Sequence, residues 1–224
     1  MANVTKTPEK KRIRRILVNA ALATLEREGW KVAKVRGGGK GRVRRISRGS
    51  ENLLAAIRTS QDEWIAFPRN DDDDGWVTLS DVDVVVAATV DDPASPKVAK
   101  VHLFDAAELR ERFDRAYTAR RAAGHTIPLG RGVWVSLYDD EATDPPSRVG
   151  AGIGNLRPPI AQIPLNDVAA IAPDLPQGGP TARPSAANDH GLDDGESLTI
   201  AQAKARLART LGVDPRSIKI TVEA

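Results

Sequence analysis

Apolar residues recur at helical spacing near the start of the chain. The segment Thr7-Pro8-Glu9 has the residues of a helix start: a hydroxyl at the N-cap, proline in the first turn and an acid beside it. The apolar positions that follow form one stripe, Ile13, Leu17, Ala20 or Ala21, and Leu25. This pattern predicts a helix over residues 8–28 that ends at Gly29 and buries one face.

Short alternating and apolar runs then predict strands. They lie at residues 30–35, 42–47, 53–60, 63–67, 82–90, 98–104 and 132–138. The first two flank Gly37-Gly38-Gly39 and are expected to form a hairpin. The run 82–90 is apolar on both faces, which indicates a central strand.

A second helix is predicted after the strand at 98–104. Asp105 and Glu108 have the spacing of a capping box, with Asp in place of Ser or Thr. The helix should end at Gly124, with a core stripe of Leu109, Phe113, Ala116 and Tyr117. The pairs Glu108–Arg112 and Glu111–Arg115 are expected on its solvent side.

The order of these elements predicts the fold class and the domains. Helix, strands, helix and strand indicate an α/β (α+β) fold, one mixed β-sheet flanked by helices, plus a small C-terminal helix-strand module. We expect a basic α/β domain at 1–165 and a Pro/Gly-rich disordered linker at 166–197. The module at 198–224 has too few residues for its own core. It is therefore predicted to mediate homodimerisation or to dock on a protein partner.

Composition places the chain in the ordinary globular range and excludes several chemistries. Hydrophobic residues make up 41% and charged residues 28% of 224. The longest apolar run, 84–90, is too short to span a bilayer, and no secretory signal is found, so we expect a cytoplasmic protein without a membrane partner. The absence of cysteine excludes disulfides, cysteine-bound zinc and thiol catalysis.

The charge is concentrated at one end of the chain. Residues 1–50 contain 15 Lys and Arg but three acids, a net charge of +12, so the remainder must carry −9 to give the total of +3. Such asymmetry attracts polyanions, and nucleic acid, DNA or RNA, is the commonest. The alternatives are a solvated surface, an acidic protein partner or an anionic membrane.

The basic residues of the first helix and the hairpin are the candidate nucleic-acid contacts. Cations in the first turns of a helix oppose its dipole, so an external anion explains them better than helix stability does. The predicted binding residues are Lys10, Lys11, Arg12, Arg14, Arg15, Lys40, Arg42, Arg44, Arg45, Arg48 and Arg58. The glycine-rich turn lacks the spacing of a phosphate-binding loop.

The segment 53–61, a strand ending in Arg58-Thr59-Ser60, resembles the motif strand of the PD-(D/E)XK, or restriction-endonuclease-like, superfamily. The order of the elements over residues 8–124 is similar as well. In that family two carboxylates bind magnesium and a lysine orients the attacking water. By position, Ala56 replaces one of these acids and Arg58 replaces the lysine.

The resemblance implies a nuclease scaffold that holds DNA without cutting it. Arginine keeps its proton near neutral pH, and the magnesium site would lose half its charge. We therefore expect no catalytic residue, no metal and no cofactor. Three alternatives stay open. Arg58-Thr59-Ser60 is an ordinary strand end, or the protein is an interaction or regulatory module, such as an antitoxin-like or defence-associated subunit, whose basic face meets an acidic partner. Relocated acids such as Glu51 or Glu63 supporting an active nuclease are the third.

Other polar and aromatic residues give weaker signals. The three histidines show no zinc-binding spacing, and the acidic run 71–74 is expected to be a solvated loop. The tryptophans are either stacking partners for bases or core residues. They are Trp30, Trp64, Trp76 and Trp134. Trp76, beside the acidic loop, is expected to be the most exposed.

Overall fold

The computed structural model describes residues 7–35 and 43–171. The chain divides into two compact units, residues 1–187 and 188–224, and the second unit lies outside the described residues. The predicted module at 198–224 and most of the predicted linker lie outside them as well.

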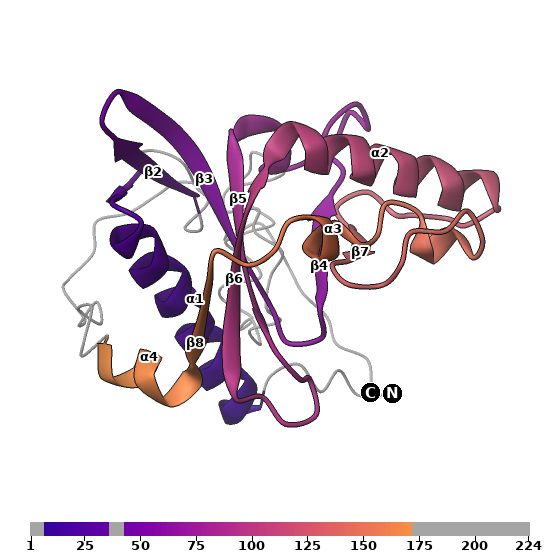
Figure 1. The fold of residues 1–224 in the computed structure, drawn as a ribbon. Helices are drawn as coiled ribbons and strands as arrows, with labels where there is room; N and C mark the ends of the chain where they lie inside the picture. Colours follow the sequence, from indigo (N-terminus) through magenta and orange to yellow (C-terminus); the bar gives the residue numbers. More distant parts are fainter. Residues whose placement is uncertain (1–6, 36–42, 172–224) are drawn as a thin grey trace, which may run out of the picture. The chain divides into compact units, whose positions relative to one another are not determined.

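Six strands form one mixed sheet in the order β1-β2-β3-β5-β6-β8 (Figure 1). Strands β3 and β5 are parallel, whereas every other neighbouring pair is antiparallel. The strands are β1 (Lys31–Lys34), β2 (Val43–Arg48), β3 (Glu51–Ser60), β5 (Val84–Val90), β6 (Val98–Asp105) and β8 (Ala161–Pro164). The α+β class is thus confirmed, and the apolar run of β5 lies between two neighbours as its pattern predicts.

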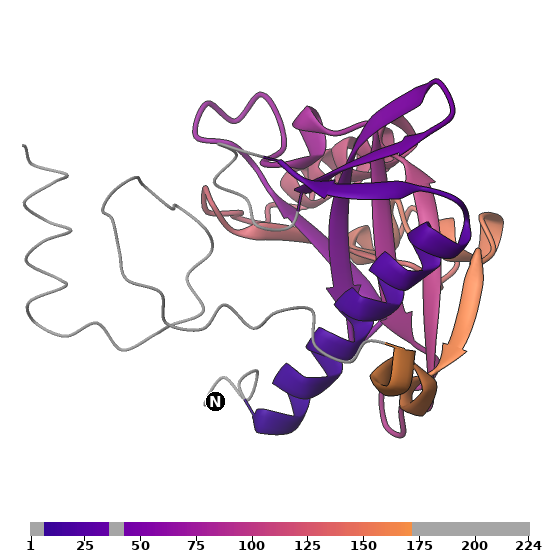
Figure 2. The ribbon, with the colours of Figure 1, turned by 90° about the vertical axis from the view of Figure 1, so that its left-hand side faces the viewer.

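One face of the sheet is covered by α1 (Pro8–Arg27) and α4 (Leu165–Ile171), as Figure 2 shows for α1. We call it the α1 face, and its side chains include Ile46, Ile57 and Val86. The hydroxyl of Thr7 accepts a hydrogen bond from the Lys10 amide at 3.3 Å, so the predicted N-cap is confirmed.

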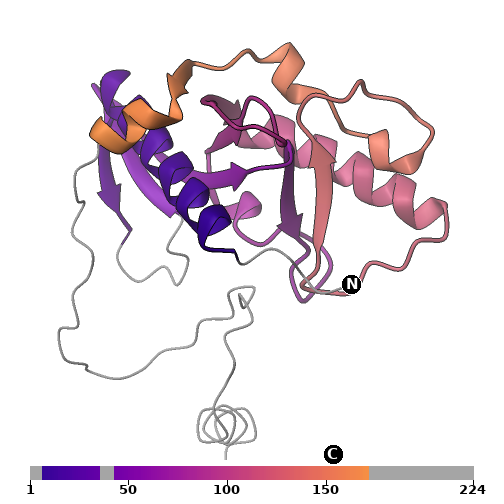
Figure 3. The same cartoon turned by 90° about the horizontal axis from the view of Figure 1, so that it is seen from below.

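The opposite face, here the α2 face, is covered by two groups of other elements. Helix α2 (Ala106–Ala122) packs on it together with a separate two-stranded sheet of β4 (Trp64–Pro68) and β7 (Gly132–Ser136). Figure 3 shows β4 and β7 side by side. The predicted capping residue of α2, Asp105, accepts a hydrogen bond from the Glu108 amide at 2.9 Å.

Some local predictions about these elements are wrong. Trp76 is 3% exposed, because its ring packs edge-on against Phe113 and its indole N–H donates to Asp114. Arg112 is buried rather than solvated, because its guanidinium donates to the carbonyls of Gly150 and Ala151. Both contacts join segments distant in sequence, which periodicity within one helix does not reveal.

The segment after Pro145, which the sequence analysis assigns to no helix or strand, adds several elements to the fold. They are the 3-10 helix η2 (Pro146–Arg148), α3 (Ile153–Leu156), β8 and α4; a further 3-10 helix, η1 (Leu79–Asp81), precedes β5. Helix α4 extends past the predicted domain boundary at 165, and its Leu165 and Val168 are buried in the α1-face core. In the part of the chain that the structure describes, no helix combines the length and apolar character of a membrane span.

Candidate nucleic-acid interface

The first turns of α1 present a cluster of exposed cations. Lys10, Lys11, Arg12 and Arg15 are all exposed, and no carboxylate of the described residues lies within ion-pair distance of them. Arg14, the fifth predicted residue of this helix, is half-buried. We call the four exposed residues the α1 basic cluster.

The helix itself does not stabilise this cluster. The N-terminal end of a helix carries partial positive charge, and Glu9 is the only acid in the first turn. Four cations there repel one another and the helix dipole in the free protein. A bound polyanion would remove both repulsions.

The basic cluster is fixed to the end of β3 and the segment that leads into β4. The side-chain amide of Gln61 donates to the Lys10 carbonyl at 2.9 Å. Gln61 follows the last residue of β3 and precedes Trp64, the first residue of β4, by three positions. The start of α1 therefore has a fixed position relative to both sheets.

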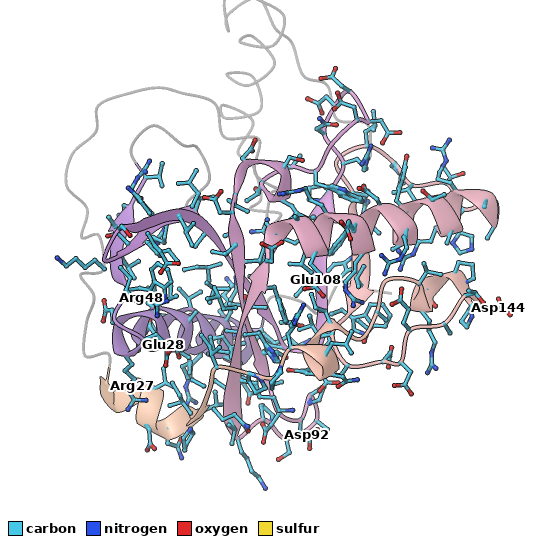
Figure 4. All side chains as sticks on the ribbon, turned by 45° about the horizontal axis from the view of Figure 1, so that its top comes forward. Arg27, Glu28, Arg48, Asp92, Glu108 and Asp144 are labelled. Atoms are coloured by element: carbon cyan, nitrogen blue, oxygen red, sulfur yellow. The ribbon has the colours of Figure 1, made fainter. Side chains whose placement is uncertain are left out.

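Arg48 lies near the C-terminal end of α1 and contacts neighbouring parts of the fold. Its guanidinium donates to the carbonyl of Glu28, which lies beside it in Figure 4, at 3.2 Å. The guanidinium also lies 4.3 Å from the centre of the Trp30 ring and pairs with Glu51 at 3.3 Å. Glu28 is on the order of 27 Å along the helix from Lys10. Arg48 is therefore engaged in structural contacts away from the α1 basic cluster.

The other arginines of β2 are divided between the two faces of the sheet. Side chains alternate along a strand, so Arg44 shares the α1 face with Ile46 while Arg45 points to the α2 face. Arg44 is half-buried and Arg45 exposed, where it donates to Asn52 at 3.3 Å. The predicted contacts Lys40 and Arg42 lie outside the described residues.

Arg58 is a partly buried cation on the α2 face, so the sheet separates it from the α1 basic cluster. Its guanidinium lies 4.4 Å from the centre of the Phe67 ring and donates a long hydrogen bond, 3.5 Å, to the Ile57 carbonyl. No carboxylate among the described residues pairs with it. Burial lowers the pKa of Arg58 to about 10, which leaves it charged at neutral pH.

The position that would carry the nuclease acid is packed in the core. Ala56 is 0% exposed and belongs to an apolar cluster with Val85 and Phe104. Among the described residues, no group of three or more His, Asp or Glu side chains is placed to hold a metal ion.

A buried His–Tyr pair is a polar feature that the sequence analysis did not identify. The Nδ1–H of His102 donates to the Arg157 carbonyl at 2.9 Å, so Nε2 accepts from the Tyr138 hydroxyl at 2.8 Å. Burial lowers the pKa of His102, and burial together with the Glu63 charge raises the pKa of Tyr138. The two partners are 36 residues apart, so no local pattern indicates the pair.

No protein-family model matches the chain, and comparison with curated proteins and with solved structures gives no significant match. The resemblance to the PD-(D/E)XK superfamily stays a prediction.

Proposed function

We propose that this protein binds nucleic acid through the α1 basic cluster and does not cut it. The observation that carries the proposal is the cluster itself: four exposed cations without an ion-pair partner among the described residues, held at a helix start that disfavours positive charge. Phosphate contacts by Lys and Arg supply most of the affinity of non-specific nucleic-acid binding.

Two observations support a role without catalysis. A carboxylate in place of Ala56 would be buried among apolar side chains, and the sequence has none there. Arg58, with a pKa of about 10, retains its proton at neutral pH and so is a poor general base.

The positions of Glu51 and Glu63 argue against the alternative of an active nuclease. Glu51 begins β3 and pairs with Arg48, whereas Glu63 lies beyond the other end of the same strand. A strand of ten residues is roughly 30 Å long, so these two carboxylates are too far apart to share a metal ion.

The test is a salt-dependent binding assay with a triple variant of the cluster. Lys11→Gln, Arg12→Gln and Arg15→Gln remove three charges and keep good helix formers. For a short random-sequence duplex, affinity should fall. The slope of log K against log salt should become shallower by about 0.9 for each phosphate that the variant no longer neutralises.

A matched control removes the same charge from the other side of the fold. Arg115, Arg121 and Arg148, which lie on α2 and η2, are changed together to Gln. This control should bind with the wild-type slope. Equally weakened binding in the two variants would mean that net charge alone attracts the duplex, and an unchanged slope in a folded α1 variant would remove the cluster from the interface.

A further inference from the structure

The solvent side of the β4–β7 sheet is an uncharged surface with two tryptophans. The inner side chains of this sheet, such as Phe67 and Val133, belong to the α2-face core. The outer side chains alternate with them and include Trp64 and Trp134. Trp134 is 52% exposed and Trp64 is half-buried. Neither strand contains a charged residue.

The two indoles are neighbours on this outer face. Trp64 pairs with Ser136 and Trp134 with Ala66, so the rings are diagonal cross-strand neighbours. Among the described residues, neither ring stacks on another aromatic ring and neither indole N–H donates a hydrogen bond.

The residues next to Trp134 on this face have small side chains. A side chain at Gly132 would place its Cβ 2.9 Å from the Cβ of Ala66 and 3.8 Å from the Trp134 indole nitrogen. Glycine and alanine therefore add little side-chain bulk beside the indole of Trp134, which is 52% exposed.

The start of α1 and the exposed Arg131 lie near the two ends of this surface. Gln61, which holds the Lys10 carbonyl, lies three residues before Trp64, about 10 Å of extended chain at most. Arg131 is exposed immediately before β7. Of the two acids that precede β4, Asp62 accepts hydrogen bonds from the Ser60 hydroxyl and the Trp64 amide, and Glu63 is half-buried next to Trp64.

We propose that the outer face of the β4–β7 sheet stacks unpaired nucleobases on Trp134 and Trp64, so that single-stranded nucleic acid is the preferred ligand. The inference rests on the proposed function, because the α1 basic cluster would hold the phosphates of the same strand. Aromatic side chains beside a positively charged track are the usual means of binding single strands without sequence preference. Bases in a duplex are already stacked and cannot use this surface.

The experiment compares oligo(dT) with a short duplex on variants of Trp134. Trp134→Thr removes the ring and retains strand propensity, while Trp134→Tyr retains a stacking ring. Removal of stacking on one base lowers affinity by about 5- to 150-fold. We expect that decrease for oligo(dT) with Trp134→Thr, recovery with Trp134→Tyr, and unchanged duplex affinity and salt slope. The control is Leu156→Thr, since Leu156 is 64% exposed on α3.

The outcomes separate this inference from the proposed function. If Trp134→Thr and Trp134→Tyr both bind oligo(dT) as the wild type does, the surface is not a base platform, although binding by the α1 basic cluster would stand. If the wild type binds neither oligo(dT) nor duplex, both proposals fail. A wild-type dimer that Trp134→Thr converts to a monomer in light scattering would make this face an interface between copies and overturn the inference.

Discussion

Arg58 provides a sharp test of whether an arginine is retained for binding or for stability. We consider Arg58→Met, which keeps an unbranched chain over the Phe67 ring and removes the charge. In the folded protein this guanidinium lacks an ion-pair partner among the described residues, so its charge is a cost. The substitution is expected to stabilise the protein.

The size of the effect follows from the pKa of Arg58, which burial lowers from its ordinary value to about 10. At about 1.4 kcal/mol per pKa unit, the charge costs the folded state roughly 3 kcal/mol. The cation–π contact with Phe67 offsets about 1–2 kcal/mol of that, and a methionine–aromatic contact would replace part of it. The free energy of unfolding should therefore rise by about 1–3 kcal/mol in the variant.

The dependence on pH is fixed by the same shift. Below pH 10 the guanidinium is protonated in the folded and the unfolded chain, so the cost is constant. Above about pH 10 the unfolded chain binds the proton more tightly than the folded chain, so wild-type stability gains from this group as pH rises. The difference between variant and wild type should therefore be flat from about pH 6 to pH 9.

Urea unfolding at several pH values measures this difference. Arg48→Met is the matched control, because Arg48 also lies over a ring but pairs with Glu51 and has a side chain 47% exposed. It should be destabilised by up to about 1 kcal/mol. A decrease in stability of more than about 1 kcal/mol in Arg58→Met would refute the reasoning and make Arg58 a structural residue.

Three further predictions concern other parts of the fold. Gly150→Ala should lower the free energy of unfolding in urea by about 2–4 kcal/mol, because φ of Gly150 is +81° and the new Cβ would lie 2.4 Å from the Arg112 carbonyl oxygen. The control Gly130→Ala should lower it by only about 1 kcal/mol, because Gly130 has a similar φ, +75°, but open space around the new Cβ. Stability should fall as pH drops below 6.5, because the unfolded chain protonates His102 at a higher pH than the folded chain does; a flat pH profile of stability would contradict this. Tyr138→Phe should lower the free energy of unfolding by about 1–3 kcal/mol, because it leaves Nε2 of His102 without its hydrogen-bond donor. An unchanged unfolding midpoint in this variant would contradict that prediction. Supercoiled DNA incubated with Mg²⁺ or Mn²⁺ should stay intact on agarose gels, whereas nicking that copurifies with the protein and disappears in Arg58→Ala would contradict the non-catalytic proposal.

The elements that the sequence predicts well are those with local determinants. The caps Thr7 and Asp105 act within four residues of themselves, and the apolar run of β5 needs no partner to be recognised. Strand β8 is not predicted because four residues give too short a pattern.

The features that bear most on function depend on contacts between distant segments. Both Trp134 and Trp76 are followed by valine in the sequence, but Trp76 contacts Phe113 and Asp114 whereas Trp134 is exposed to solvent. Arg58 lies on the face opposite α1 because side chains alternate between the two faces along β3. The sequence pattern shows this alternation, but it does not show which of the two faces α1 covers.

The pairing of β8 with β6 has a consequence for synthesis on the ribosome. Ile163 on β8, with Leu165 and Val168 on α4, closes the apolar core beneath α1, which is synthesised before them. Until these residues leave the exit tunnel, the nascent chain has an unpaired edge on β6 and an uncovered apolar surface on α1. Both are features that promote aggregation, so chains that terminate before β8 should require chaperones to stay in solution.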